Sequence, residues 1–165
     1  MKILKSLVIV LAMAAMVAGA TSAAWMDQQV VGSNTFATGN LDISTNPASA
    51  LFTVSDIYPG WNETKSIVVA NDGTVPLNYQ VSANKDSGDD VLWNAPEFLL
   101  NIGTTAGTGD IYSGTVKNAS FASARNLAAS ANETIYFTVS LDINAGNGLQ
   151  NKTVMVNFVF DATQP

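Results

Sequence analysis

Apolar and polar residues alternate through the stretch Thr134-Ile135-Tyr136-Phe137-Thr138-Val139-Ser140-Leu141, and this pattern decides the fold class. Its odd-numbered residues are all apolar, whereas the even-numbered ones form a polar face that includes Tyr136. A second stretch, Thr153 to Asp161, repeats the pattern with Val154, Val156, Phe158 and Phe160 on one face. Such period-two patterning is typical of half-buried antiparallel strands. Because glycines and asparagines occupy residues 144–148, we predict two antiparallel strands joined by a loop.

Shorter stretches with the same period occur upstream. Residues 79–83 alternate and follow the apolar run 67–69 across Asn71-Asp72-Gly73, which predicts a second strand pair around a turn. Further strands are expected at residues 41–44, 52–54 and 98–102, a single helical turn at 89–93, and a loop at glycines 103, 107 and 109. Seven or more short strands without a long amphipathic helix predict an all-β fold, a two-sheet antiparallel sandwich of jelly-roll or immunoglobulin-like type, with no indication of strand order.

The first 24 residues have the pattern of an export signal. Lys2 and Lys5 precede an uncharged, mostly apolar run from Leu7 to Ala20, and small residues follow. This order predicts a helical signal peptide at residues 1–24. Cleavage is expected after one of two small residues, Ala23 or Ala24.

Two further segments follow the signal peptide, an N-terminal segment at residues 25–34 and a sandwich domain at 35–165. A retained membrane anchor is the alternative to cleavage, because an apolar count extended to Met26 approaches the roughly 18 residues that span a bilayer.

Composition excludes several kinds of chemistry. The chain has no histidine and no cysteine, so it lacks disulfides, thiolate metal sites, His-dependent catalytic sets and the His-Glu-x-x-His zinc motif. Loss of Lys2 and Lys5 leaves five basic side chains against 13 acidic ones, a net charge of −8. We therefore expect no nucleic-acid partner, and membrane contact only through the signal peptide during export. We also expect no catalytic residue and no cofactor.

Three groups of residues are candidates for binding or modification. Asp86, Asp89 and Asp90 offer oxygen ligands at a loop, which suits calcium, although their spacing is not that of an EF-hand and a solvated acidic loop is the alternative. Four Asn-x-Ser/Thr sequons are candidate N-glycosylation sites in an exported chain: Asn62, Asn118, Asn132 and Asn151. Five aromatic residues suggest a carbohydrate-stacking platform, with interior packing as the alternative: Tyr58, Trp61, Trp93, Tyr112 and Tyr136.

Several segments, in their order along the chain, are similar to the TasA/camelysin family of exported, fibre-forming proteins of biofilm matrices. They are Ala24 to Asp27, Asn34 to Ile43, Val54 to Gly60, Ile67 to Gly73 and Thr153 to Gln164. The resemblance implies a jelly-roll-like sandwich whose subunits join end to end into filaments. In related archaeal bundling pilins, the freed N-terminal segment of one subunit adds as a strand to the sheet of the next. Camelysin-type members are described as metallopeptidases, an activity that the missing histidines disfavour.

Residues 25–34 have the properties that such strand donation needs. The part from Trp25 to Val31 is short, Pro-free and partly apolar, and cleavage frees one of its ends, so its backbone can pair with an open sheet edge. The inserted side chains are expected to be Trp25, Met26, Val30 and Val31. Because the donated strand enters another subunit, the contact is head-to-tail and propagates into a fibre.

The sequence therefore predicts an exported structural subunit whose partners are copies of itself, with matrix polysaccharide as a further candidate partner. In the first alternative, residues 25–34 are merely an edge strand of their own sandwich. In the second, the chain is a monomeric carbohydrate-binding module at the cell surface.

Overall fold

Eight strands and three short helical turns occupy the part of the chain that the computed structural model describes, which is residues 29, 32–33 and 35–165. The strands are β1 (Ile43–Asn46), β2 (Asn62–Asn71), β3 (Leu77–Gly88), β4 (Phe98–Gly103), β5 (Tyr112–Thr115), β6 (Arg125–Leu127), β7 (Asn132–Leu141) and β8 (Val154–Thr163). The helical turns are α2 (Asp90–Trp93), η1 (Val116–Asn118) and η2 (Asn147–Leu149). All of these elements lie in one compact unit, Thr38–Pro165, and the described residues before Thr38 have no regular secondary structure. The predicted signal peptide, its cleavage at Ala23 or Ala24, and the donor residues Trp25, Met26, Val30 and Val31 lie outside the described residues.

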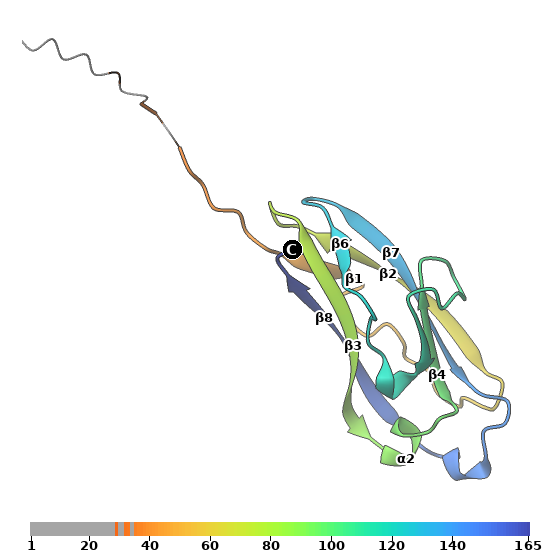
Figure 1. The fold of residues 1–165 in the computed structure, drawn as a ribbon. Coiled ribbons are helices and arrows are strands. Elements are labelled where there is room, and N and C mark those ends of the chain that lie inside the picture. Colours follow the sequence, from red (N-terminus) through yellow and green to blue (C-terminus); the bar gives the residue numbers. More distant parts are fainter. Residues whose placement is uncertain (1–28, 30–31, 34) are drawn as a thin grey trace, which may run out of the picture. The chain divides into compact units, whose positions relative to one another are not determined.

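The strands form two antiparallel sheets, which confirms the predicted fold class. One sheet has the order β1-β2-β7-β4-β5, and the other has the order β6-β3-β8. In Figure 1, β8 lies beside β3, and α2 lies at the end of the sandwich where β3 ends and β8 begins. The inward residues of β2 and β7 pack against those of β3 and β8, so the core lies between the sheets.

Both predicted strand pairs are wrong, although the strands themselves exist. β7 pairs with β2 and β4, whereas β8 pairs with β3 in the other sheet. Likewise, β2 and β3 do not pair with each other, because β3 pairs with β6 and β8. Alternation identifies the buried face of a strand but not its neighbour, and turn residues suit a loop that crosses between sheets as well as a hairpin.

Asn71 holds the chain where it crosses from β2 to β3. Its side chain is buried, and its amide donates to the carbonyl oxygens of Val75, Leu127 and Ala128. Its carbonyl oxygen accepts from the backbone N–H of Gly73. The predicted hairpin turn is therefore a crossover in which one buried amide bonds to Gly73 and Val75 and ties them to residues 127–128.

Other differences concern short elements. The expected strand at residues 52–54 is wrong, because no strand occurs between β1 and β2. β5 and β6, of four and three residues, escaped prediction because so few residues show no reliable period. The expected helical turn exists as α2, and the expected strand at 98–102 exists as β4.

One polar cluster joins the two sheets. The buried Tyr79 of β3 donates its hydroxyl hydrogen to Glu133 of β7 at 2.7 Å, and Arg125 of β6 makes an ion pair with the same carboxylate. Burial is the largest influence on the pKa of Glu133 and raises it. The hydrogen bonds from Arg125 and Tyr79, together with the Arg125 charge, outweigh burial, so the net pKa is lowered. The ionised form of Glu133 therefore stabilises the fold.

Acid is expected to weaken the fold through this cluster. The folded-state pKa of Glu133 lies below its ordinary value of about 4.5, so the contribution is complete above pH 4.5 and is lost as pH falls through the lowered pKa. We expect the urea midpoint of the wild type to fall between pH 6 and pH 3, and that of Glu133→Gln to start lower and fall less. Equal losses in both proteins would contradict this role.

Candidate functional site

The two sheets have very unequal borders within the described residues. Their outer strands are β1, β5, β6 and β8. The first three have only three or four residues each, whereas β8 has ten. A border strand leaves every second pair of backbone N–H and C=O groups without a ladder partner. β8 therefore offers the longest open edge, longer than residues 62–67 of β2, which β1 does not cover.

The ladder identifies which backbone groups of β8 face outward. On β3, Ala83 donates its N–H to Ala119, and Val81 accepts from Phe121, so both residues direct their backbone groups away from β8. Their β8 partners, Phe158 and Phe160, are therefore non-hydrogen-bonded pairs and also direct their groups outward. The same alternation gives Ala162 an outward N–H and C=O. No backbone partner lies on that side within the described part of the chain.

β8 is also less buried than its sequence pattern suggests. The inward residues of β7 from Ile135 to Leu141 are all buried. The corresponding residues of β8, from Val154 to Phe160, are only half-buried, although they are equally apolar. The difference arises because β7 lies between two strands, whereas β8 has a neighbour only in β3.

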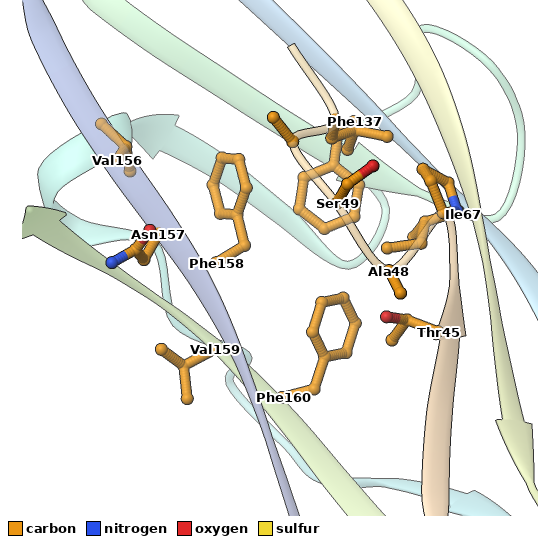
Figure 2. Close-up of a pocket in the computed structure, with 13 residues that line it drawn as sticks. Thr45, Ala48, Ser49, Ile67, Phe137, Val156, Asn157, Phe158, Val159 and Phe160 are labelled. Carbon is orange, nitrogen blue, oxygen red and sulfur yellow. The ribbon is translucent and has the colours of Figure 1, made fainter.

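An open groove of about 460 Å³ lies along this border. We call it the β8 groove. It is lined by residues from β8, β1, β2, β7 and the segment after β1: Thr45, Pro47–Leu51, Ile67, Phe137 and Val156–Phe160. Figure 2 shows Phe158 and Phe160 directed from β8 toward the groove, whereas Asn157 and Val159 point the other way. The rings of Phe137 and Phe158 have centroids 4.9 Å apart and form one wall of the groove.

The β8 edge lacks the features that usually protect a border strand. Exposed edges are commonly blunted by proline, by charged side chains, by a bulge or by shortness. β8 contains no proline, and Asp161 is its only charged residue. Its pairing with β3 is irregular only near its start, opposite Lys85 and Ser87. The groups exposed here are thus a long backbone edge and a groove lined mainly by apolar side chains, which together suit an added strand.

The predicted calcium ligands are engaged separately. Asp89 accepts a hydrogen bond from the backbone N–H of Thr153, which is the largest cause of its lowered pKa, and it also lies near Lys152. Asp90 pairs with Lys85, and Asp86 accepts from Asn157. Within the described residues, no three acidic side chains form a group that could hold a metal ion. The calcium hypothesis therefore gains no support from the geometry.

The five candidate aromatics do not form a platform. Trp61, Trp93 and Tyr112 pack partly against the core, whereas Tyr58 is exposed in a loop. Tyr136 is half-buried on the outer face of its sheet. No two of these rings pair with each other among the residues described. The structure also places the four sequon asparagines at exposed positions, none of them on β8.

Sequence reasoning assigned Phe158 and Phe160 to the core and missed that they border an open groove. The available signal was weak. Val159 and Met155 make β8 apolar on parts of both faces, which is unusual for a strand with one solvated face. Only the strand order shows that β8 ends its sheet.

The chain matches a known protein family. A sequence model of the family described as camelysin metallo-endopeptidase matches residues 2–163, which is nearly the whole chain. None of the curated proteins matches the chain. Among the described residues, no helix has the length and hydropathy needed to cross a membrane.

Proposed function

The chain belongs to the camelysin family, and from this premise we propose that it is an exported structural subunit that polymerises into an extracellular filament. In this proposal, residues 25–34 of one subunit pair with the β8 edge of the next. The observation that carries the proposal is the ten-residue open edge beside a groove lined mainly by apolar side chains. Each subunit then has one donor segment and one acceptor edge, so the contact repeats in one direction.

Pairing at this edge supplies two kinds of stabilisation. The outward N–H and C=O groups of Phe158, Phe160 and Ala162 gain partners, at about 0.5–1.5 kcal/mol for each hydrogen bond. Alternate side chains of the added strand point into the β8 groove, where they cover the half-buried faces of Phe158 and Phe160. Trp25, Met26, Val30 and Val31 are the apolar side chains available in the donor segment. The backbone hydrogen bonds contribute to the affinity for the donor strand. The side chains that enter the β8 groove fix the register of that strand on β8.

A metallopeptidase activity does not fit the residues of this chain. The family description implies a bound metal ion. Protein zinc sites are built from cysteine, histidine and carboxylate ligands, with His-Glu-x-x-His typical of zinc proteases. This chain has neither histidine nor cysteine, and its described carboxylates do not gather. We therefore derive no catalytic step from the family description.

Blocking the β8 edge should stop assembly without unfolding the subunit. Ala162→Pro removes one outward N–H and places a ring where the donor strand must approach, while the β3 ladder keeps its bonds. We expect the critical concentration for filament formation to rise at least roughly 10-fold, which corresponds to about 1.4 kcal/mol. Sedimentation of assembled protein over a concentration series measures this change.

Ala162→Val is the matched control, because it keeps the N–H and favours a strand. It should assemble as the wild type does. If Ala162→Pro is folded by circular dichroism and assembles at the wild-type concentration, the β8 edge is not the acceptor.

A further inference from the structure

Two neighbouring strands of the larger sheet, β2 and β7, begin with the same three residues. Asn62-Glu63-Thr64 starts β2, and Asn132-Glu133-Thr134 starts β7. Both are N-glycosylation sequons. Because the chain is rich in Asn, Ser and Thr, the number of sequons carries little weight by itself. Their placement in the sheet is more informative.

Strand geometry presents the asparagine and the threonine of each sequon to solvent. Residues i and i+2 of a strand lie on the same face, so the asparagine and the threonine of each sequon share the outer face, away from the buried Ile67 and Ile135. In the ladder, Asn62 is opposite Ser140, and Asn132 is opposite Ala70. The two asparagines therefore lie at opposite ends of one face, about 26 Å apart along the strands.

The amide groups of the sequon asparagines are not engaged within the described chain. Eight of the other eleven described asparagines use their side chains in hydrogen bonds. None of the four sequon asparagines does so among the described contacts, and all four are exposed. An amide nitrogen that must accept an oligosaccharide needs this freedom.

The surrounding face suits a neutral, hydrated substituent. The outward positions of β2, β4 and β7 carry no charged side chain, although the chain has 13 acidic residues. They are mainly Ser, Thr and Asn, and Thr64 and Thr138 share a hydrogen bond of 2.8 Å. A sugar on this face therefore neither desolvates a charge nor enters the core.

We propose that Asn62 and Asn132 are N-glycosylated, which makes the outer face of the larger sheet the carbohydrate-bearing face of the subunit. The amide nitrogen of each asparagine forms a bond to the anomeric carbon of an oligosaccharide carried by a lipid-linked phosphate donor. The bond from that carbon to the phosphate oxygen breaks, and the phosphate takes up the amide proton. The proposal rests on the export proposed above, since such donors are used at the membrane during or after transfer. β8 belongs to the other sheet, and β2 and β7 contribute only the inward residues Ile67 and Phe137 to the groove, so glycans on the outer face leave the β8 edge free for strand addition.

Mass spectrometry of the chain purified from the cells that make it tests the proposal. The intact mass should exceed that of the polypeptide by at least two glycans, and peptide mapping should place them on Asn62 and Asn132. Thr64→Ala and Thr134→Ala each destroy one sequon and should each remove one glycan. Thr138→Ala is the matched control, because it breaks the same Thr64 hydrogen bond but leaves both sequons intact.

Two results would overturn the proposal in distinguishable ways. A mature N-terminus at residue 24 or 25 with an unmodified mass contradicts glycosylation but leaves the filament proposal standing. An unmodified chain that retains residues 1–24 contradicts cleavage, without which the donor segment has no free end, and both proposals fail with it.

Discussion

A mature chain without residues 25–34 will remain a folded monomer at concentrations at which the intact mature chain forms filaments. All described strands lie in the unit Thr38–Pro165, so the deletion removes the donor segment and leaves the β8 edge and groove in place. We expect no filaments by negative-stain microscopy and a single monomer boundary in sedimentation velocity. Because every subunit needs a donor, the loss of assembly should be complete rather than partial.

A second variant keeps residues 25–34 in the mature chain and removes only their apolar side chains. Serine at Trp25, Met26, Val30 and Val31 keeps the backbone but removes the apolar groups offered to the groove. This variant should also fail to form stable filaments, since bonds along a solvated edge contribute little without burial. If deletion of residues 25–34 unfolds the domain, these residues are a strand of their own sandwich, which contradicts the prediction.

Phe137→Ala will lower the free energy of unfolding by about 3–5 kcal/mol, the usual range for removing a buried phenylalanine. Phe137 is fully buried on β7, and its ring packs against Phe158 and Phe160 of the opposite sheet. Its removal joins a new cavity to the β8 groove at the point where the two sheets meet. Urea denaturation measures the loss.

Ile143→Ala is the control for this prediction. Ile143 is exposed in the loop after β7, with 71% of its surface accessible, so its truncation should change stability by less than about 0.5 kcal/mol. If Phe137→Ala costs no more than Ile143→Ala, the two sheets do not share the core described above.

The faces of the long strands could be predicted from sequence, because burial follows the period of the side chains. Ile135, Phe137, Val139 and Leu141 all lie in the core as expected. The neighbours of these strands could not be predicted. β7 and β8 look like a hairpin in sequence, yet they lie in different sheets, since residues 142–153 cross between the sheets. The neighbour of a strand depends on how the buried faces pack in three dimensions. The alternation of apolar and polar residues does not contain this information.

The β8 groove could not be predicted from the sequence for the same reason. Phe158 in β8 and Phe137 in β7 occupy equivalent positions in equivalent patterns, but one is half-buried and the other fully buried. What separates them is the number of neighbouring strands. The donor segment, residues 25–34, is by contrast a hypothesis drawn from the sequence. It rests on the apolar, Pro-free residues after the predicted cleavage site, which lie outside the described residues.

Hydrogen exchange at Phe158, Phe160 and Ala162 tests strand addition at β8 most directly. In the chain that lacks residues 25–34, these three backbone amides should exchange rapidly, because no strand covers them. In filaments of the intact mature chain, the same amides should be strongly protected, whereas Val159 and Asp161, which bond to β3, should be protected in both samples. Rapid exchange at Phe158, Phe160 and Ala162 within intact filaments would contradict the account.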